Sequence, residues 1–171
     1  WQFYRGNLPE DTAVINSHAA SYASCKAGVG DSAAKKEFAD REWRTVNLPH
    51  DYFCESEVGP QNLLSHGYRE RDNAWYRKSF VLDETLKNKS LTFCFEGTAV
   101  NAEFYFNGSL MARSFSAYTE TTFDITDRAY FDGRPNVLAV RILGFATEGW
   151  WYEGAGIYRN VNLLIAEQVG F

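Results

Sequence analysis

The stretch Ser90-Leu91-Thr92-Phe93-Cys94-Phe95-Glu96 carries the clearest strand pattern in the chain. Its apolar side chains fall on one face, because the residues of a strand point alternately to its two sides. Gly97-Thr98 then turns the chain, and a second stretch alternates in the same way at Val100, Ala102, Phe104 and Phe106. These two stretches predict two β-strands, each with one apolar face.

Strand patterns continue on both sides of this pair. Asn107-Gly108 is the strongest short hairpin signal, because both residues tolerate a positive φ, and residues 110–113 form the expected returning arm. Residues 137–142 are apolar on both faces apart from Arg141, which predicts a central, covered strand. Further strands are expected at residues 1–5 (a first edge strand), 43–48 and 75–82, and from Ile157 onward, and residues 123–127 begin as a strand and end in a turn. Many short strands without a long helix predict an all-β sandwich.

Residues 16–40 differ in composition, being rich in Ala, Ser, Gly and Lys. We interpret this segment as a surface insertion, since long loops are rarely featureless in compact domains. Residues 32–39 are the place for one short helix, with Asp31 or Ser32 as its N-cap. Residues 53–73 contain Gly59, Pro60 and Gly67 among many polar residues and predict a second long loop.

Composition limits the functions that the chain can have. With 171 residues it is long enough for one well-buried domain, and its 16% of aromatic residues suits a thick two-sheet core. The net charge of −5 and the lack of Lys/Arg clusters argue against nucleic-acid binding. No apolar run approaches the roughly 20 residues that span a bilayer. The chain begins at Trp1 without Met or a signal pattern, so we expect it to be an excised or processed piece.

The cysteines Cys25, Cys54 and Cys94 are odd in number and lack the spacing of a metal site, so at most one disulfide is possible. Cys94 lies within a strand pattern and is expected to be a small buried apolar side chain. Cysteine usage therefore does not indicate a compartment.

Three consecutive aromatic residues, Trp150, Trp151 and Tyr152, stand between Glu148 and Glu153. The glycines around them allow a tight turn, so we expect an aromatic loop that leads into a half-buried strand. Sugars present apolar C–H faces and polar edges, which aromatic rings beside carboxylates can bind. The alternative is that Trp151 and Tyr152 cap the core or meet a neighbouring domain, which leaves Trp150 as the exposed ring.

A His-Asp pair, His50-Asp51, follows the expected strand at residues 43–48. Such a pair suggests acid–base chemistry, but no nucleophile can be assigned to it from the sequence. We favour a structural interpretation in which the pair fixes a loop by hydrogen bonds. Adjacent acids such as Asp83-Glu84 are interpreted as solvated charge, so no catalytic residue is assigned.

Seven motifs follow one another along the chain: Leu48-Pro49-His50-Asp51-Tyr52, Ala74-Trp75-Tyr76-Arg77-Lys78-Ser79-Phe80, Phe95-Glu96-Gly97, Phe106-Asn107-Gly108, Asp124-Ile125-Thr126, Asn136-Val137-Leu138-Ala139-Val140-Arg141 and Trp151-Tyr152-Glu153-Gly154-Ala155-Gly156-Ile157-Tyr158-Arg159-Asn160-Val161. In this order they together resemble the N-terminal sugar-binding domain of glycoside hydrolase family 2, β-galactosidase type. The resemblance covers residues 41–166, with weaker support at residues 1–7. Each motif alone is modest, but their common order is specific.

The resemblance implies that residues 1–171 form a single jelly-roll domain, similar to galactose-binding domains, that precedes an immunoglobulin-like domain and a TIM barrel. In this family the barrel carries the acid/base and nucleophile glutamates of a retaining glycosidase. The implied partners are those two domains and a β-galactoside-like carbohydrate substrate shared with them. The family also implies a secreted or periplasmic parent and no cofactor.

In several members of the family, the loop before the Gly-Ile-Tyr-Arg strand reaches the active site of the barrel. Some carry there an Asp that helps to hold sodium or the sugar, and this chain has Trp150 instead, so no metal is expected. The usual Pro is replaced by Glu153. Two hypotheses remain: an accessory domain that shapes the cleft of a β-glycosidase, and an autonomous carbohydrate-binding module that uses loop 148–153. A purely structural or adhesive sandwich is a weaker third.

Overall fold

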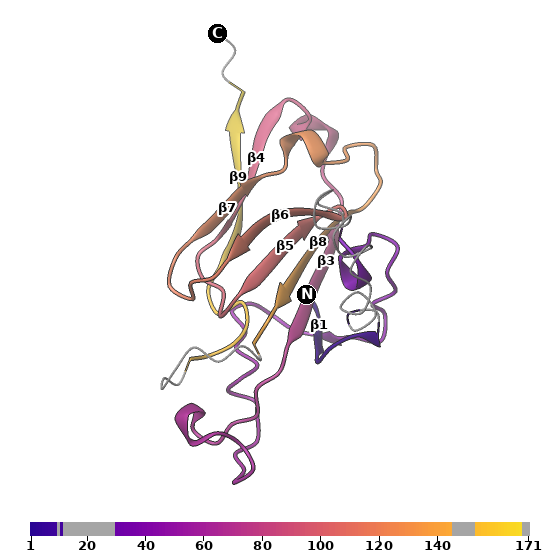
Figure 1. The fold of residues 1–171 in the computed structure, drawn as a ribbon. Coiled ribbons are helices and arrows are strands. Elements are labelled where there is room, and N and C mark those ends of the chain that lie inside the picture. Colours follow the sequence, from indigo (N-terminus) through magenta and orange to yellow (C-terminus); the bar gives the residue numbers. More distant parts are fainter. Residues whose placement is uncertain (10, 12–29, 145–152, 169–171) are drawn as a thin grey trace, which may run out of the picture.

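The computed structural model describes residues 1–9, 11, 30–144 and 153–168 of the chain. These residues form a sandwich of two antiparallel sheets (Figure 1). The larger sheet has the strand order β2-β1-β3-β8-β5-β6, formed by Arg44–Thr45, Gln2–Arg5, Ala74–Phe80, Asn136–Ile142, Ala102–Phe106 and Ser109–Ser114. The smaller has the order β7-β4-β9, formed by Thr121–Asp124, Lys89–Phe95 and Val161–Glu167. Four described elements are short 3-10 turns: η1 (Ser32–Ala34), η2 (Leu64–His66), η3 (Glu84–Leu86) and η4 (Thr126–Arg128).

The core lies between the two sheets and is rich in phenylalanine. Leu91, Phe93 and Phe95 of β4 point inward, as their alternation predicts, and are at most 6% exposed. Phe95 lies 4.6 Å from Phe104 of the facing sheet, measured between ring centroids. The prediction of an all-β sandwich is confirmed, and its two antiparallel sheets agree with the expected jelly roll.

The hairpin prediction at Asn107-Gly108 is also confirmed. The turn joins β5 to β6 with φ values of 49° at Asn107 and 84° at Gly108, the left-handed region that these residues tolerate. The Asn107 side chain accepts a hydrogen bond from the backbone N–H of Val137 (2.9 Å) and donates one to the carbonyl of Arg128 (2.8 Å). This side chain therefore ties the hairpin to the start of β8.

Strand β8 lies between β3 and β5 and is buried along its length apart from half-buried Arg141, as predicted. Its outer face is covered by residues that the sequence assigned to the surface insertion. Ala33 and Ala34 are at most 1% exposed and pack with Trp75. The buried guanidinium of Arg77 donates to the carbonyls of Ala33 and Lys35 and to Asp40. Residues 30–40 thus form a second layer on the sheet, whereas residues 12–29 lie outside the described part.

Three expectations need correction. The helix at 32–39 is only the turn η1, because Lys35 is extended (φ −65°, ψ 142°) and the side chain of Asp31 makes no capping bond. Strand β1 is not at the edge, because β2, only two residues long, pairs outside it. The last strand starts at Val161 rather than Ile157, since Gly156 makes only an isolated bridge and Arg159 is exposed.

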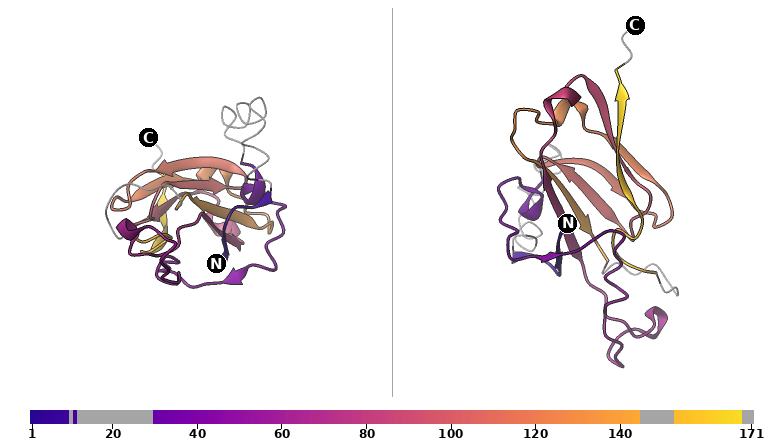
Figure 2. Two further views of the ribbon diagram at one scale, coloured as in Figure 1. Left: turned by 60° about the horizontal axis from the view of Figure 1, so that its bottom comes forward. Right: turned by 180° about the vertical axis from the view of Figure 1, so that it is seen from behind.

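The sandwich has two distinct ends (Figures 1 and 2). Residues 54–72 project from one end, near which β8 finishes and residues 153–160 run, whereas β9 finishes at the opposite end.

None of the described helices is long and apolar enough to cross a membrane.

Candidate functional site

The predicted sugar-binding residues fall mostly on undescribed positions. Glu148, Trp150, Trp151 and Tyr152 lie outside the described residues, and Glu153, which is described, is half-buried. The structure does describe both flanks of this aromatic loop, namely Gly144 and residues 153–157. Together with residues 50–52, which contact both flanks, we call these residues the loop base.

The motif His50-Asp51-Tyr52 fixes the second flank. The backbone N–H of His50 donates to the carbonyl of Ile157 (2.8 Å), and that of Tyr52 donates to the carbonyl of Ala155 (3.0 Å). Between them, Oδ1 of Asp51 accepts from the N–H of Ala155 and from that of Phe53, both at 3.0 Å. The structural interpretation of the His-Asp pair is therefore confirmed: the pair holds a loop 104 residues away in sequence.

Two glycines allow this close approach. A Cβ on Gly154 would lie 2.3 Å from Oδ2 of Asp51. Gly156 has a φ of +134°, and a Cβ there would lie 2.5 Å from the carbonyl oxygen of His50 and 2.6 Å from the hydroxyl of Tyr76. Side chains rarely adopt this backbone conformation, so glycine is required for steric and conformational reasons.

Tyr52 connects the loop base to the first flank. Its ring is 1% exposed, and burial raises the pKa of its hydroxyl, which stays protonated and donates to the carbonyl of Asp72 (2.7 Å). A Cβ on Gly144 would lie 2.3 Å from this hydroxyl and 2.5 Å from the same carbonyl. Both flanks of the aromatic loop therefore contact the motif His50-Asp51-Tyr52. Residues 54–72 follow this motif in the chain, and their last residue, Asp72, bonds to Tyr52.

His50 belongs to a polar network that the sequence did not reveal. Its Nδ1 lies 2.7 Å from the hydroxyl of Tyr76, and its Nε2 lies 3.1 Å from Glu55. Arg44 donates a hydrogen bond to Glu55 at 2.6 Å. This bond is the main cause that lowers the pKa of the Glu55 carboxyl, and the hydrogen bond with His50 lowers it further. With both ring nitrogens of His50 engaged, the network holds the loop base rather than presenting a free base.

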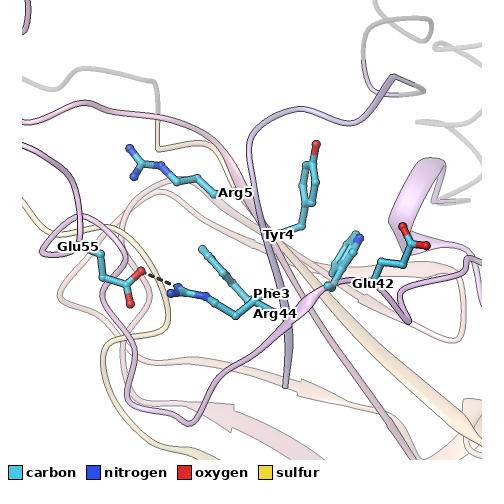
Figure 3. A pocket seen from close by; sticks show the side chains of 7 residues that line it. Phe3, Tyr4, Arg5, Glu42, Arg44 and Glu55 are labelled. Carbon is cyan, nitrogen blue, oxygen red and sulfur yellow. Dashed lines mark hydrogen bonds and ion pairs between the residues drawn. The ribbon is translucent and has the colours of Figure 1, made fainter.

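An open depression lies beside this network (Figure 3), lined by Phe3, Tyr4, Arg5, Glu42, Trp43, Arg44 and Glu55. The guanidinium of Arg44 lies 5.1 Å from the ring centroid of Phe3 and reaches Glu55, whereas Glu42 lies on the far side of the depression. Tyr4 stacks on Trp43 with ring centroids 5.4 Å apart. Most of these groups already bind one another, so the depression contains no poised acid–base pair.

The described cysteines are both free. Burial is the main cause that raises the pKa of the Cys94 thiol to about 11, in agreement with its expected role as a buried apolar side chain. Cys54 is exposed, and its thiol donates to Oδ2 of Asp51 at 3.3 Å, which raises its pKa. Cys25 lies outside the described residues.

Comparison with known proteins gives a consistent result. The family described as "Glycosyl hydrolase 2 galactose-binding domain-like" matches residues 54–152. Among curated proteins, "Beta-galactosidase BoGH2A" of Bacteroides ovatus is 38% identical over 140 residues, which are 80% of this chain and 16% of that protein. A "Beta-galactosidase" of Thermoanaerobacter pseudethanolicus is 31% identical over 146 residues, which are 79% of this chain and 19% of that protein.

Solved structures agree. A "beta-glycosidase from Bacteroides vulgatus" has a TM-score of 0.74 and 31% identity, covering 81% of this chain and 19% of that one. A glycosyl hydrolase family 2 member from Bacteroides cellulosilyticus has a TM-score of 0.73 and 30% identity, covering 98% of this chain and 20% of that one. The chain therefore spans a fifth or less of the length of these relatives.

Proposed function

The chain belongs to the glycosyl hydrolase 2 galactose-binding domain-like family, and on that premise we propose that it is the non-catalytic N-terminal domain of an exo-acting β-glycosidase, a β-galactosidase. In this proposal a downstream TIM barrel supplies both catalytic carboxylates, as retaining glycosidases require a pair across the scissile bond. The domain contributes one wall of the sugar cleft and stabilises the multidomain enzyme.

The observation that carries this proposal is the loop base. Asp51, Tyr52 and the two close-packed glycines, Gly154 and Gly156, hold the flanks of residues 145–152. A loop held at both ends presents its side chains with less loss of conformational entropy on binding. We propose that Trp150 offers a ring face to the sugar and that Trp151, Tyr152, Glu148 and Glu153 complete this wall.

The two β-galactosidase relatives support the choice of a β-galactoside as substrate. A relative named "Putative beta-glucuronidase" from Formosa agariphila is 30% identical over 134 residues. Glucuronides are therefore the second substrate class to test beside β-galactosides. From the family alone, we propose a secreted or periplasmic parent protein.

The experiment compares the full-length parent with the chain of residues 1–171. The parent is expected to hydrolyse nitrophenyl β-galactoside, and the chain alone is expected to show neither hydrolysis nor calorimetric binding of galactose, lactose or glucuronate at millimolar concentration. Binding by the chain alone that is lost in Trp150→Ala identifies an autonomous carbohydrate-binding module instead. A parent without glycosidase activity contradicts the proposal outright.

A further inference from the structure

The turn that follows β6 carries the two most exposed large apolar side chains in the described part of the chain, Phe115 (71%) and Tyr118 (72%). Both side chains are aromatic, and neither ring contacts another ring or a cation among the described residues. We call residues 115–118 the aromatic turn. Exposed rings that gather on one short segment are typical of a surface that binds a ligand or a partner.

The aromatic turn has a fixed backbone. The hydroxyl of Ser114 donates to the carbonyl of Ser116 (3.0 Å), and the backbone N–H of Tyr118 donates to the hydroxyl of Ser116 (3.2 Å). Between the two exposed rings, Ala117 is buried. The rings are therefore carried by an ordered turn, which reduces the conformational entropy lost on binding.

The register of the large sheet places the aromatic turn at the end that carries the loop base. Ala102 of β5 pairs both with Ile142, the last residue of β8, and with Ser114, the last residue of β6. The next residue after β8, Leu143, lines one small hollow together with Phe115. Leu143 immediately precedes the first flank of the aromatic loop, so the aromatic turn lies beside that flank.

The aromatic turn also contacts the chain that follows the second flank. The hydroxyl of Tyr158 donates to the carbonyl of Ala117, and both residues pack in one small cluster with Ala99. Ala99 in turn exchanges two backbone hydrogen bonds with Gly156 of the loop base, at 2.7 and 2.9 Å. The aromatic turn and the aromatic loop thus share one end of the sandwich and one set of supporting contacts.

The hollow beside Phe115 supplies polar groups. It has a volume of about 150 Å³ and is lined by Asn101, Ala102, Glu103, Arg113, Ser114, Phe115 and Leu143. The side-chain amide of Asn101 has no hydrogen-bond partner within the described residues. Arg113 pairs with Glu103 at 3.1 Å and is 45% exposed. Pockets that enclose a whole small ligand measure roughly 300–1,000 Å³, so this hollow fits one ring of a longer ligand.

The chemistry of this surface matches a saccharide. Thr119 and Glu120, which follow Tyr118, are exposed, so the two rings stand among hydroxyl, amide and charged groups. A sugar unit offers a C–H face to an aromatic ring and hydroxyl groups to amides, carboxylates and guanidinium groups. Separate rings among such polar groups suit successive units of a sugar chain.

We propose that the aromatic turn is a distal carbohydrate subsite, which binds a sugar unit on the leaving-group side of the scissile bond in an oligosaccharide substrate. The terminal sugar lies at the aromatic loop, and the following units pass over Phe115 and Tyr118. This inference rests on the proposed function, because it needs the cleavage site that the downstream barrel supplies. It extends the substrate from a simple β-galactoside to an oligosaccharide of several units.

The test compares two substrates of the full-length parent. Nitrophenyl β-galactoside has a leaving group without a sugar unit, whereas β-1,4-linked galactotetraose has a leaving group of three units. The double variant Phe115→Ala with Tyr118→Ala is expected to lower kcat/KM at least about tenfold for the tetraose and less than about twofold for nitrophenyl β-galactoside.

Two control variants accompany this comparison. Phe115→Tyr combined with Tyr118→Phe keeps both ring faces and is expected to retain kcat/KM for the tetraose. Val81→Ala removes a side chain that is 60% exposed and follows Phe80, which pairs with the first residue of β8 at the other end of that strand. It is expected to change kcat/KM for neither substrate.

Two kinetic results overturn the inference. One is an unchanged kcat/KM for the tetraose in the double variant. The other is an equal loss for both substrates, because it identifies rings that support the fold or pack on another domain instead of binding sugar.

A second readout needs no catalysis. In saturation-transfer NMR with the full-length parent, a sulfur-linked galactotetraose that glycosidases do not cleave is expected to receive saturation at its inner units, and to lose it in the double variant. A parent without glycosidase activity that shows this difference contradicts the proposed function alone. An active parent that does not show it contradicts only the distal subsite.

Discussion

The sharpest prediction concerns Asp51, whose Oδ1 accepts the backbone N–H groups of Phe53 and Ala155 at 3.0 Å each. Asp51→Ala leaves both N–H groups without this partner, and both residues are buried. Hydrogen bonds to a charged group contribute about 1.5–3 kcal/mol each. Allowing for water that enters the space, we expect a loss of about 3 kcal/mol in the free energy of unfolding. For a chain of this length that corresponds to a fall in Tm of about 6–12 °C.

The assay is urea and thermal unfolding followed by circular dichroism. Asp51→Asn keeps an oxygen at the Oδ1 position and is expected to cost clearly less than Asp51→Ala. The control is Asp132→Ala, on an exposed turn, with no measurable change expected. An Asp51→Ala variant as stable as the control refutes this anchoring role of Asp51. A second readout is local: loss of the bond to Asp51 lowers the pKa of the Cys54 thiol, so peptide-resolved alkylation of Cys54 at pH 8 should become faster.

Gly156→Ala should destabilise the fold by about 2–4 kcal/mol in urea unfolding, because its Cβ meets the carbonyl of His50; a neutral effect contradicts the geometry. Glu55→Gln should lower stability at pH 7, with the difference from the parent sequence shrinking as pH falls below about 4.5. The folded-state pKa of Glu55 is depressed, so a difference that persists at pH 2 is the contrary result. Arg77→Leu should cost about 3 kcal/mol by the same assay, because it leaves the buried carbonyl of Ala33 and the carboxylate of Asp40 without this partner; a cost below about 1 kcal/mol argues against it.

Local patterns predicted the strands whose one face is buried. The alternation of Leu91, Phe93 and Phe95 is enough to place β4, because the period of two assigns each side chain to a face. Asn107-Gly108 placed its hairpin because only a few residues accept positive φ at consecutive positions. Strand β4 and this hairpin are both determined by residues that are close together in the sequence.

Features set by distant contacts were missed. Strand β2 has only two residues and exists because β1 pairs with it, and residues 30–40 turn inward because Arg77 and Trp75 hold them. At the site, the anchoring role of Asp51 was foreseen, but its partner Ala155, and the contacts of His50 with Tyr76 and Glu55, are brought together only by the fold. The sequence predicted a loop at residues 53–73, but which of its apolar side chains are exposed is decided by the fold.

We propose that the aromatic loop forms one wall of the sugar cleft of a larger enzyme. The most direct measurement is kcat/KM of the full-length parent with nitrophenyl β-galactoside, comparing Trp150→Ala with Tyr130→Ala, a half-buried aromatic residue that bonds to Asn136 at the start of β8. We predict that Trp150→Ala lowers kcat/KM by at least about tenfold, equal to ~1.4 kcal/mol of transition-state binding, with an unchanged circular dichroism spectrum. An unchanged kcat/KM in Trp150→Ala contradicts this role of the aromatic loop.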